Sequence, residues 1–339
     1  MAETLLTVED LRVSFDTYAG EVRAVRGVSF RVDKGETLAI VGESGSGKSV
    51  TAQSVMRLAP DNSIRYKTGH IDFNGREILK LSEKELCKIR GGEIGMILQD
   101  PLTSLNPMMP VGKQIAEGLI KHQNLKKPQA IEKSIEMLKM IGIPEPEKRV
   151  KQYPHEFSGG MRQRVSIAIA LACNPKLLIA DEPTTALDVT IQAQILKLMK
   201  KLQNDLGTAI ILITHDLGIV AEMADRVMIM YAGNIVESGS CEEIFYNPQH
   251  PYTWGLLGSI PKVGQKNKEK LESIKGTPPD LHAEIKGCPF KHRCKYAMSV
   301  CHQYQPQSYQ ISPGHVANCF LHHEMAPAVI NPVTKREVK

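Results

Sequence analysis

Alternation of hydrophobic and polar positions dominates the first forty residues. The stretches LLTVEDLRVSF and EVRAVRGVSFRV switch between apolar and polar residues at nearly every step, and the turn signal Asp33-Lys34-Gly35 follows them. A period of two is typical of strands with one buried face. We therefore expect strands throughout this region.

The pattern changes at TLAIVG, a continuous apolar run typical of a strand that is covered on both faces of a parallel sheet. A glycine-rich loop and a helical pattern follow, which predicts a βα unit. Further on, Asn74-Gly75 predicts a tight turn, and Ser82 with Glu85 predicts a capping box that opens a short helix before the strand EIGMILQ.

Apolar residues then recur at helical spacing from about residue 111 to 150, which predicts a helical insertion forming a separate lobe. After Ser158, helices alternate with the strands KLLIAD, AIILIT and RVMIMYAG. This repeated βα rhythm predicts an α/β fold with a doubly wound sheet. Beyond about Pro251 the pattern fades, and we expect a small accessory domain there.

The composition adds limits on function. The 339 residues are 42% hydrophobic and 23% charged, as in soluble globular proteins. The sequence has no apolar stretch of the ~20 residues that a membrane helix needs and no secretory signal, so we expect a cytosolic protein. The formal charge is +5, and lysines gather around Lys262 to Lys270 without interleaved aromatics, so we expect no nucleic-acid partner.

A phosphate-binding loop of the form G-x-x-x-x-G-K-[ST] lies between the apolar strand and the helix that follows it. Its residues are Gly42, Glu43, Ser44, Gly45, Ser46, Gly47, Lys48 and Ser49, with Val50 next in the helix. The glycines let backbone N–H groups and the helix N-terminus point at one anion. We expect Lys48 to reach the terminal phosphates of ATP and Ser49 to ligate Mg²⁺.

Two further segments suit nucleotide chemistry. The apolar strand KLLIAD ends in Asp181 and Glu182, which fit a carboxylate that holds Mg²⁺ through water and a carboxylate that polarises the attacking water. Ser158, Gly159 and Gly160 begin a helix rich in Ala and Ile, which is a second helix start suited to an anion.

The order of these motifs, with Gln99 after a strand, Asp188 in Ala-Leu-Asp and His215 after AIILIT, resembles the ABC ATPase family over about residues 5 to 255. The resemblance implies a P-loop NTPase core with an antiparallel β subdomain and an inserted helical subdomain at about residues 100–160. It also implies that Gln99 senses Mg²⁺ and the attacking water, that Asp188 links two nucleotide sites and that His215 contacts the γ-phosphate.

Other implications of the resemblance concern the nucleotide. An aromatic residue of the early strands stacks on adenine in this family, and Phe15 is favoured slightly over Tyr18. The family usually has Gln at the fifth signature position, where this chain has Met161, but Ser158, Gly159 and Gly160 are intact. The family's sites are closed by a second subunit, so one chain supplies half of each ATP site.

The segments MILQDPLTSLNPMMPVGKQI and HPYTWGLLGSIP, and the tail GTPPDL with GCPFKHRC, resemble the ATP-binding subunits of dipeptide, oligopeptide and nickel importers. This resemblance implies an ATPase at the cytoplasmic face of the cell membrane that powers peptide uptake. It implies a second ABC ATPase subunit (identical or related), two transmembrane permease subunits docking near residues 99–125, and indirectly an extracytoplasmic peptide-binding protein.

Alternatives to peptide import remain open at this point. They are import of nickel or another small solute, a soluble ABC ATPase that acts on nucleic acid or ribosomes, and a regulatory nucleotide binder without catalysis. Paired cassettes or long coiled insertions, common in the ribosome-acting proteins, are missing from the sequence, and Lys48, Asp181, Glu182 and His215 argue against dead catalysis.

Four of the seven cysteines gather near the end of the chain, in what the motifs indicate is a C-terminal extension over residues 256–339. Cys288, Cys294, Cys301 and Cys319 have the spacing C-x₅-C-x₆-C-x₁₇-C, wider than that of ordinary structural zinc sites. Four thiolates are the ligand set of a [4Fe–4S] cluster, and some importer subunits of this type carry one. An iron–sulfur cluster is our prediction, with zinc and free thiols as alternatives.

Overall fold

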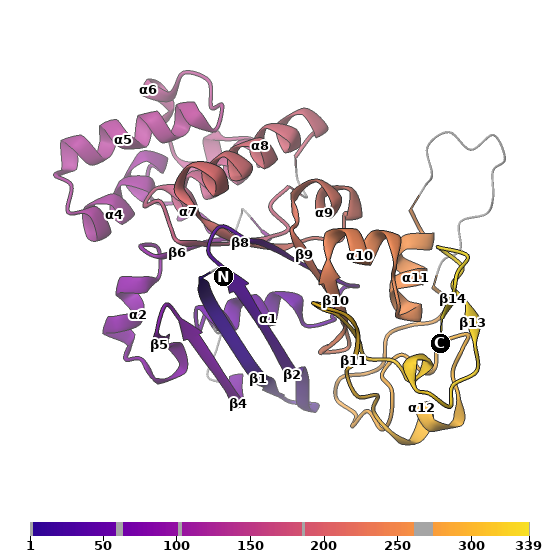
Figure 1. The fold of residues 1–339 in the computed structure, drawn as a ribbon. Helices are drawn as coiled ribbons and strands as arrows, with labels where there is room; N and C mark the ends of the chain where they lie inside the picture. Colours follow the sequence, from indigo (N-terminus) through magenta and orange to yellow (C-terminus); the bar gives the residue numbers. More distant parts are fainter. Residues whose placement is uncertain (1–2, 59–63, 101–103, 185–186, 261–273, 339) are drawn as a thin grey trace, which may run out of the picture.

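A mixed eight-stranded sheet forms the centre of the protein in the computed structural model, which describes residues 3–58, 64–100, 104–184, 187–260 and 274–338. The strand order is β11-β12-β10-β9-β3-β8-β7-β6 (Figure 1). The five strands from β9 to β6 are parallel to one another, whereas β10, β12 and β11 add antiparallel pairs. The bounds are β3 Thr37–Val41, β6 Ile94–Ile97, β7 Leu177–Asp181, β8 Ala209–Ile213, β9 Arg226–Tyr231, β10 Asn234–Ser240, β11 Tyr309–Ser312 and β12 His315–Ala317.

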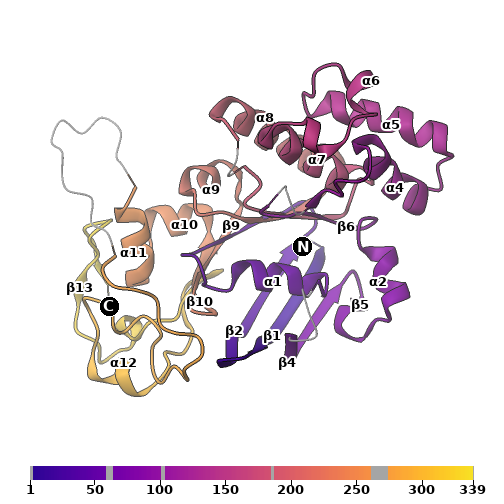
Figure 2. The ribbon, with the colours of Figure 1, turned by 180° about the vertical axis from the view of Figure 1, so that it is seen from behind.

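A second sheet of order β2-β1-β4-β5 is wholly antiparallel. Its strands are β1 Thr4–Thr17, β2 Gly20–Asp33, β4 Ile64–Phe73 and β5 Arg76–Glu77. Helix α1 (Lys48–Val55) lies beside this sheet when the molecule is seen from behind (Figure 2). Apolar side chains of the second sheet, of α1 and of β3 form one buried cluster, so α1 is packed between the two sheets.

The parallel strands are apolar on both faces, as the continuous runs predicted. In β7, Leu177 and Ile179 join the cluster around α1, whereas Leu178 and Ala180 join a cluster on the opposite face. All four side chains are fully buried. The sheet therefore has apolar layers on both sides. The loops that hold the candidate site follow the C-terminal ends of its central strands.

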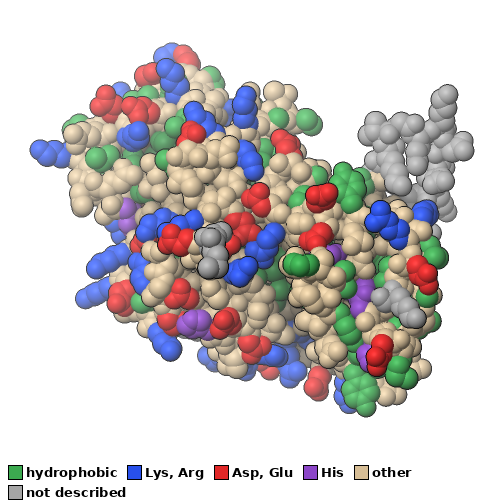
Figure 3. Space-filling view, viewed as in Figure 1, with side chains coloured by type: hydrophobic (Ala, Val, Ile, Leu, Met, Phe, Trp, Pro, Cys, Tyr) green, Lys and Arg blue, Asp and Glu red, His purple; other side chains and the backbone are tan. Residues whose placement is uncertain are grey.

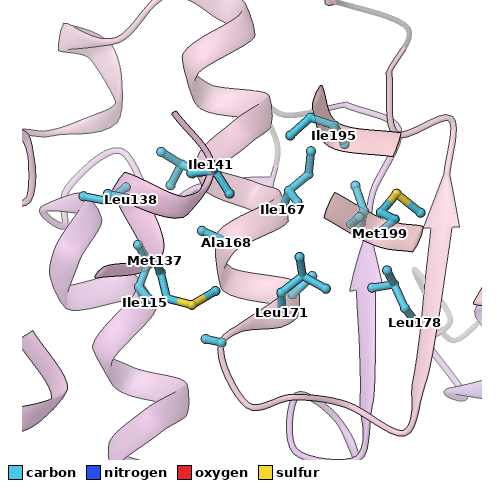
Figure 4. Close-up of a cluster of buried hydrophobic side chains, with 14 of the residues drawn as sticks. Ile115, Met137, Leu138, Ile141, Ile167, Ala168, Leu171, Leu178, Ile195 and Met199 are labelled. Carbon is cyan, nitrogen blue, oxygen red and sulfur yellow. The ribbon is translucent and has the colours of Figure 1, made fainter. Parts of the chain in front are cut away.

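Helices α7 (Gly159–Leu171) and α8 (Val189–Leu206) cover the second face. Helices α4 (Val111–Gln123), α5 (Lys127–Met140) and α6 (Pro146–Arg149) lie outside them. Figure 4 shows Ile115, Met137 and Leu138 of α4 and α5 facing Ile167 and Leu171 of α7. The predicted helical insertion thus shares its core with the helices of the sheet, and its outer parts α4 to α6 project as a lobe (Figure 1).

The remaining helices are α2 Glu83–Ile89, α9 Leu217–Met223, α10 Cys241–Tyr246, α11 Pro251–Gly258 and α12 Ser299–Gln303, and a small hairpin pairs β13 (Val329–Ile330) with β14 (Glu337–Val338). Two local predictions are confirmed. Asn74 and Gly75 both have positive φ in the turn between β4 and β5, and Ser82 and Glu85 form the capping box of α2.

The C-terminal extension continues the central sheet, which the fading sequence pattern did not predict. Strand β12 pairs with β10, so the extension is joined to the core by backbone hydrogen bonds. The predicted domain boundary after residue 255 falls inside α11 and stays a prediction. The lysine-rich segment around Lys262 to Lys270 lies outside the described residues, as do residues 101–103 of the predicted docking region.

No helix in the described part of the chain is long and apolar enough to cross a bilayer. On the face in Figure 3, Lys and Arg side chains are interspersed with Asp and Glu rather than gathered in one stripe.

One buried contact between a histidine and a glutamate holds the extension against the core. His315 of β12 contacts Glu237 of β10 at 2.9 Å between Nε2 and Oε1, and both side chains are fully buried. The Glu237 carboxylate also accepts backbone hydrogen bonds from Gln249 and His250 at 2.7 and 2.9 Å. The pair therefore ties β12, β10 and the start of α11 together.

We predict that His315→Ala lowers the free energy of unfolding by about 2–3 kcal/mol, because the buried Glu237 carboxylate loses one of its partners. Urea unfolding monitored by circular dichroism measures the change. His282→Ala, at an exposed position of the same extension, is the control. Equal stability of the two variants would show that the pair does not anchor the extension.

Candidate nucleotide site

The phosphate-binding loop between β3 and α1 depends on two glycines that leave no room for a side chain. A Cβ atom on Gly42 would lie 2.2 Å from the carbonyl oxygen of Met230, and one on Gly47 would lie 2.4 Å from that of Ala24. Gly47, the N-cap of α1, also has a φ of 97°, in the left-handed region. The loop is therefore packed tightly between β9 and β2, with the N-terminus of α1 behind it.

Lys48 is folded back into this loop. Its Nζ atom donates hydrogen bonds to the carbonyl oxygens of Gly42 and Glu43 at 2.8 and 2.9 Å, and the side chain is buried. Burial lowers the pKa of Lys48, while the carboxylates of Glu182, Asp181 and Glu43 oppose that shift. A triphosphate would offer this ammonium group stronger, anionic acceptors than the two carbonyls.

Asp181 fits the role of a magnesium ligand. Burial raises the pKa of its carboxyl group, and a hydrogen bond from Ser49 opposes the shift. Its buried Oδ1 atom has no hydrogen-bond partner among the described residues. A buried carboxylate oxygen without a donor is stabilised by a cation, so Asp181 and Ser49 are suited to hold Mg²⁺, which would neutralise charge on the phosphates.

Glu182 lies where three sequence motifs meet. Its carboxylate accepts a hydrogen bond from Gln99 Nε2 at 3.0 Å and lies 3.2 Å from Nδ1 of His215. Its backbone has a φ of 48°, a left-handed conformation that costs about 1–3 kcal/mol in a non-glycine residue. Strain of this kind at the end of a buried strand is typical of functional sites, and here it brings Glu182, Gln99 and His215 together.

Most of these groups line one pocket of about 290 Å³, and Asp181 is not among its lining residues. Its walls are the complete phosphate-binding loop with Val50, together with Gln99, Glu182 and His215. Every predicted residue of the loop therefore lines one pocket together with Gln99, Glu182 and His215, the three predicted catalytic residues. An anion-binding loop and a hydrogen-bonded carboxylate facing the same pocket suit hydrolysis of a bound triphosphate.

The Ser-Gly-Gly segment and Asp188 are helix N-caps outside this pocket. Ser158 caps α7 by accepting from the N–H of Met161 at 3.4 Å, and Asp188 caps α8 by accepting from the N–H of Ile191 at 3.0 Å. Neither residue lines the pocket, and nothing lies within 4 Å of a Cβ built on Gly159. Their roles toward a second nucleotide site stay predictions.

The aromatic candidates for adenine do not line the pocket either. Phe15 is partly buried and pairs with Val22 and Ile64 in the antiparallel sheet, whereas Tyr18 is fully exposed. The structure leaves the choice between Phe15 and Tyr18 as a prediction.

Two residues that contact the loop were missed by the sequence analysis. The Tyr252 hydroxyl accepts a hydrogen bond from the backbone N–H of Glu43 at 2.9 Å, and Arg293 forms a bidentate ion pair with the Glu43 carboxylate. They follow Glu43 by 209 and 250 residues, and no spacing or motif in the sequence connects them to it.

The prediction of a metal site at the four cysteines is wrong, for the iron–sulfur cluster and for the zinc alternative. Within the described residues, no three His, Cys, Asp or Glu side chains are grouped so that they could hold a metal ion. Burial raises the pKa of Cys288 to about 11 and that of Cys294 to about 12, and it also raises that of Cys319. Neutral thiols are poor ligands, and Cys288 and Cys301 instead pack with Phe290 and Tyr231 in an apolar cluster.

Comparisons with known proteins show the family of the chain. A family model described as "ABC transporter" matches residues 25–185, and one described as "Oligopeptide/dipeptide transporter, C-terminal region" matches residues 236–301. The chain is 60% identical to the oligopeptide transport ATP-binding protein OppD of Bacillus subtilis, over 97% of this chain and 92% of that protein. It is 54% identical to the dipeptide transport ATP-binding protein DppD of the same organism, over 96% of each.

Solved structures show the same fold. The dimeric structure of a post-hydrolysis state of the ATP-binding cassette MJ0796, bound to ADP and Pi, is 27% identical and has a TM-score of 0.64, covering 70% of this chain and 99% of that one. The structure of cbiO1 from Clostridium perfringens, part of an ABC transporter complex, is 31% identical with a TM-score of 0.59, covering 72% of this chain and 92% of that one.

The fold and the pocket define a P-loop enzyme that hydrolyses ATP with Mg²⁺. The chain belongs to the ABC transporter family, among its oligopeptide and dipeptide transport ATP-binding proteins.

We predict that Lys48→Ala weakens ATP binding by about 100-fold, because the terminal phosphates lose their charged donor. Isothermal titration of the purified chain with Mg·ATP gives the dissociation constant. Lys139→Ala, an exposed lysine of α5, serves as the control. Undiminished affinity in Lys48→Ala would refute the assignment of the loop.

Glu182→Gln separates binding from catalysis. The amide cannot take a proton from water, so ATP turnover should fall by about 100-fold or more while the affinity for Mg·ATP stays near that of the unaltered chain. A coupled phosphate-release assay measures turnover, with exposed Glu222→Gln on α9 as the control. Turnover equal to that of the control would remove Glu182 from this role.

Proposed function

We propose that this ATPase powers the import of dipeptides and oligopeptides across the cytoplasmic membrane. The observation that carries the proposal is the pocket in which the phosphate-binding loop, Gln99, Glu182 and His215 converge. The names of the relatives support the peptide substrate, because relatives with more than half of their residues identical over nearly the whole chain are oligopeptide and dipeptide transport proteins.

In this proposal the residues act as their contacts suggest. Lys48 binds the terminal phosphates, Ser49 and Asp181 hold Mg²⁺, and Gln99 lies beside both the metal and the attacking water. Glu182 polarises that water, and His215 supports Glu182 while it contacts the γ-phosphate. The 3.0 and 3.2 Å contacts to Glu182 fix the carboxylate in the pocket before the nucleotide arrives.

A second ABC ATPase subunit, identical or related, completes each site. Ser158, Gly159 and Gly160 stand at the exposed start of α7, outside the pocket of their own chain. The start of α7 offers N–H groups and has no Cβ at Gly159, so it is suited to bind the phosphates of a nucleotide on the partner subunit. Asp188 links the two nucleotide sites. ATP binding then favours the closed pair and hydrolysis the open one.

Two transmembrane permease subunits dock on the helical lobe, and the complex places this chain at the cytoplasmic face of the membrane. A groove of about 350 Å³ lies along α4 and the turn before it, within the predicted docking region of residues 99–125. Its lining is mostly apolar at Met109, Ala116 and Ile120, and Met108 beside it is 84% exposed. An extracytoplasmic peptide-binding protein delivers the substrate to those permeases.

Ile120→Asp should abolish co-purification of the membrane subunits with the tagged chain from solubilised membranes, because a charge in the groove costs binding without touching the ATP pocket. Met140→Asp, an exposed apolar position on α5, is the matched control. The proposal would be contradicted if the co-purified partners were ribosomal proteins. It would also be contradicted if Ile120→Asp retained the membrane partners as well as the control does.

Uptake of a labelled dipeptide, compared with uptake of labelled nickel by the same cells, tests the substrate.

A further inference from the structure

A carboxylate lies in the anion-binding loop itself. Glu43 lines the pocket together with Lys48, and its negative charge acts on the Lys48 ammonium group. A free carboxylate at this place would repel a triphosphate and compete with it for the lysine. The affinity for ATP therefore depends on whether the Glu43 carboxylate is paired with a positive charge.

Arg293 of the C-terminal extension pairs with the Glu43 carboxylate. Its Nη1 atom lies 2.6 Å from Oε2 of Glu43, and its Nη2 atom lies 3.0 Å from Oε1, which is a bidentate pair. The Arg293 side chain is only 6% exposed, and its Nε atom donates to the carbonyl oxygen of Lys275 at 3.1 Å. A bidentate pair whose arginine is buried and has its Nε donor satisfied holds both side chains in one geometry.

Aromatic packing fixes this pair in place. The guanidinium carbon lies 5.7 Å from the centre of the Tyr231 ring, and Phe290 of the extension packs against Tyr231 and Tyr252 at 5.2 and 5.3 Å between ring centres. Tyr252 in turn accepts the hydrogen bond from the Glu43 N–H. Both the backbone and the side chain of Glu43 are thus held by the same rigid cluster.

The extension also contacts the strand on the other side of the loop. The backbone N–H of Arg23 donates to the carbonyl oxygen of Leu281 at 3.1 Å, and the Arg26 side chain donates to the carbonyl oxygen of Ala283 at 3.2 Å. Both lie on β2 beside Ala24, whose carbonyl oxygen bounds the space at Gly47. The extension therefore contacts both flanks of the phosphate-binding loop.

We propose that Arg293 is a positioning residue for ATP, through which the C-terminal extension sets the nucleotide affinity of the chain. It neutralises Glu43 and keeps that carboxylate turned to the extension, so Lys48 remains available to the phosphates. Arg293 itself is not among the residues that line the pocket.

Equilibrium binding of Mg·ATP to the full chain tests this role. Arg293→Ala should weaken binding about tenfold, because one unpaired negative charge is added beside the phosphates. The double variant Glu43→Gln with Arg293→Ala should recover affinity to within about threefold of the unaltered chain, because the charge itself is removed. Arg336→Ala, an exposed arginine of the same extension, is the control and should bind as the unaltered chain does.

The recovery separates positioning from a structural role, because damage to the extension would not be repaired by Glu43→Gln. Unchanged affinity in Arg293→Ala, or a double variant as weak as the single one, would overturn the proposal. Thermal unfolding checks that each variant is folded. If Arg293→Ala does not fold, Arg293→Lys replaces it: loss of the bidentate contact should weaken binding about threefold, and Glu43→Gln should remove that loss.

Discussion

The turn of backbone between β3 and α1 is the constraint on which the rest of the site depends. The loop must curl tightly enough to aim N–H groups at one anion, and it does so in a space bounded by the carbonyl oxygens of Met230 and Ala24. That space exists because β3 lies between β9 and β8, with β2 packed across the loop. The two sheets therefore form a core and also fix the conformation of the loop.

Two charged groups at the nucleotide site are buried. Lys48 is buried with two carbonyl oxygens as acceptors, and Asp181 is buried with one oxygen that no described residue satisfies. A magnesium–triphosphate would supply anionic acceptors for Lys48 and a cation for Asp181.

Local patterns carried most of the fold prediction. Alternation at residues 4–33 predicted strands, the apolar run before Gly42 predicted the central strand, and the motifs along the chain predicted which residues line the pocket. The strand signals act over neighbouring residues, through periodicity and turn chemistry, whereas Gln99 and His215 lie far apart in the sequence and were predicted from the order of the family's motifs. The pairing of β12 with β10 has no such signal, because its partners are some eighty residues apart.

The same limit explains what sequence reasoning missed at the site. Tyr252 and Arg293 reach Glu43 only through tertiary packing of the extension on β9. The cysteines show the opposite error, since their crowding in sequence predicted a metal centre. In the structure Cys288 and Cys301 are buried with aromatic rings, where burial favours small, neutral, apolar side chains.

The most direct measurement of the central claim is a structure of the full chain with Mg²⁺ and a slowly hydrolysed ATP analogue. We expect phosphate oxygens within hydrogen-bond distance of the loop N–H groups, with Lys48 Nζ turned from the carbonyls of Gly42 and Glu43 to those oxygens. We also expect Mg²⁺ beside Ser49 and Asp181. A nucleotide bound elsewhere, with Lys48 still on its two carbonyls, would contradict it.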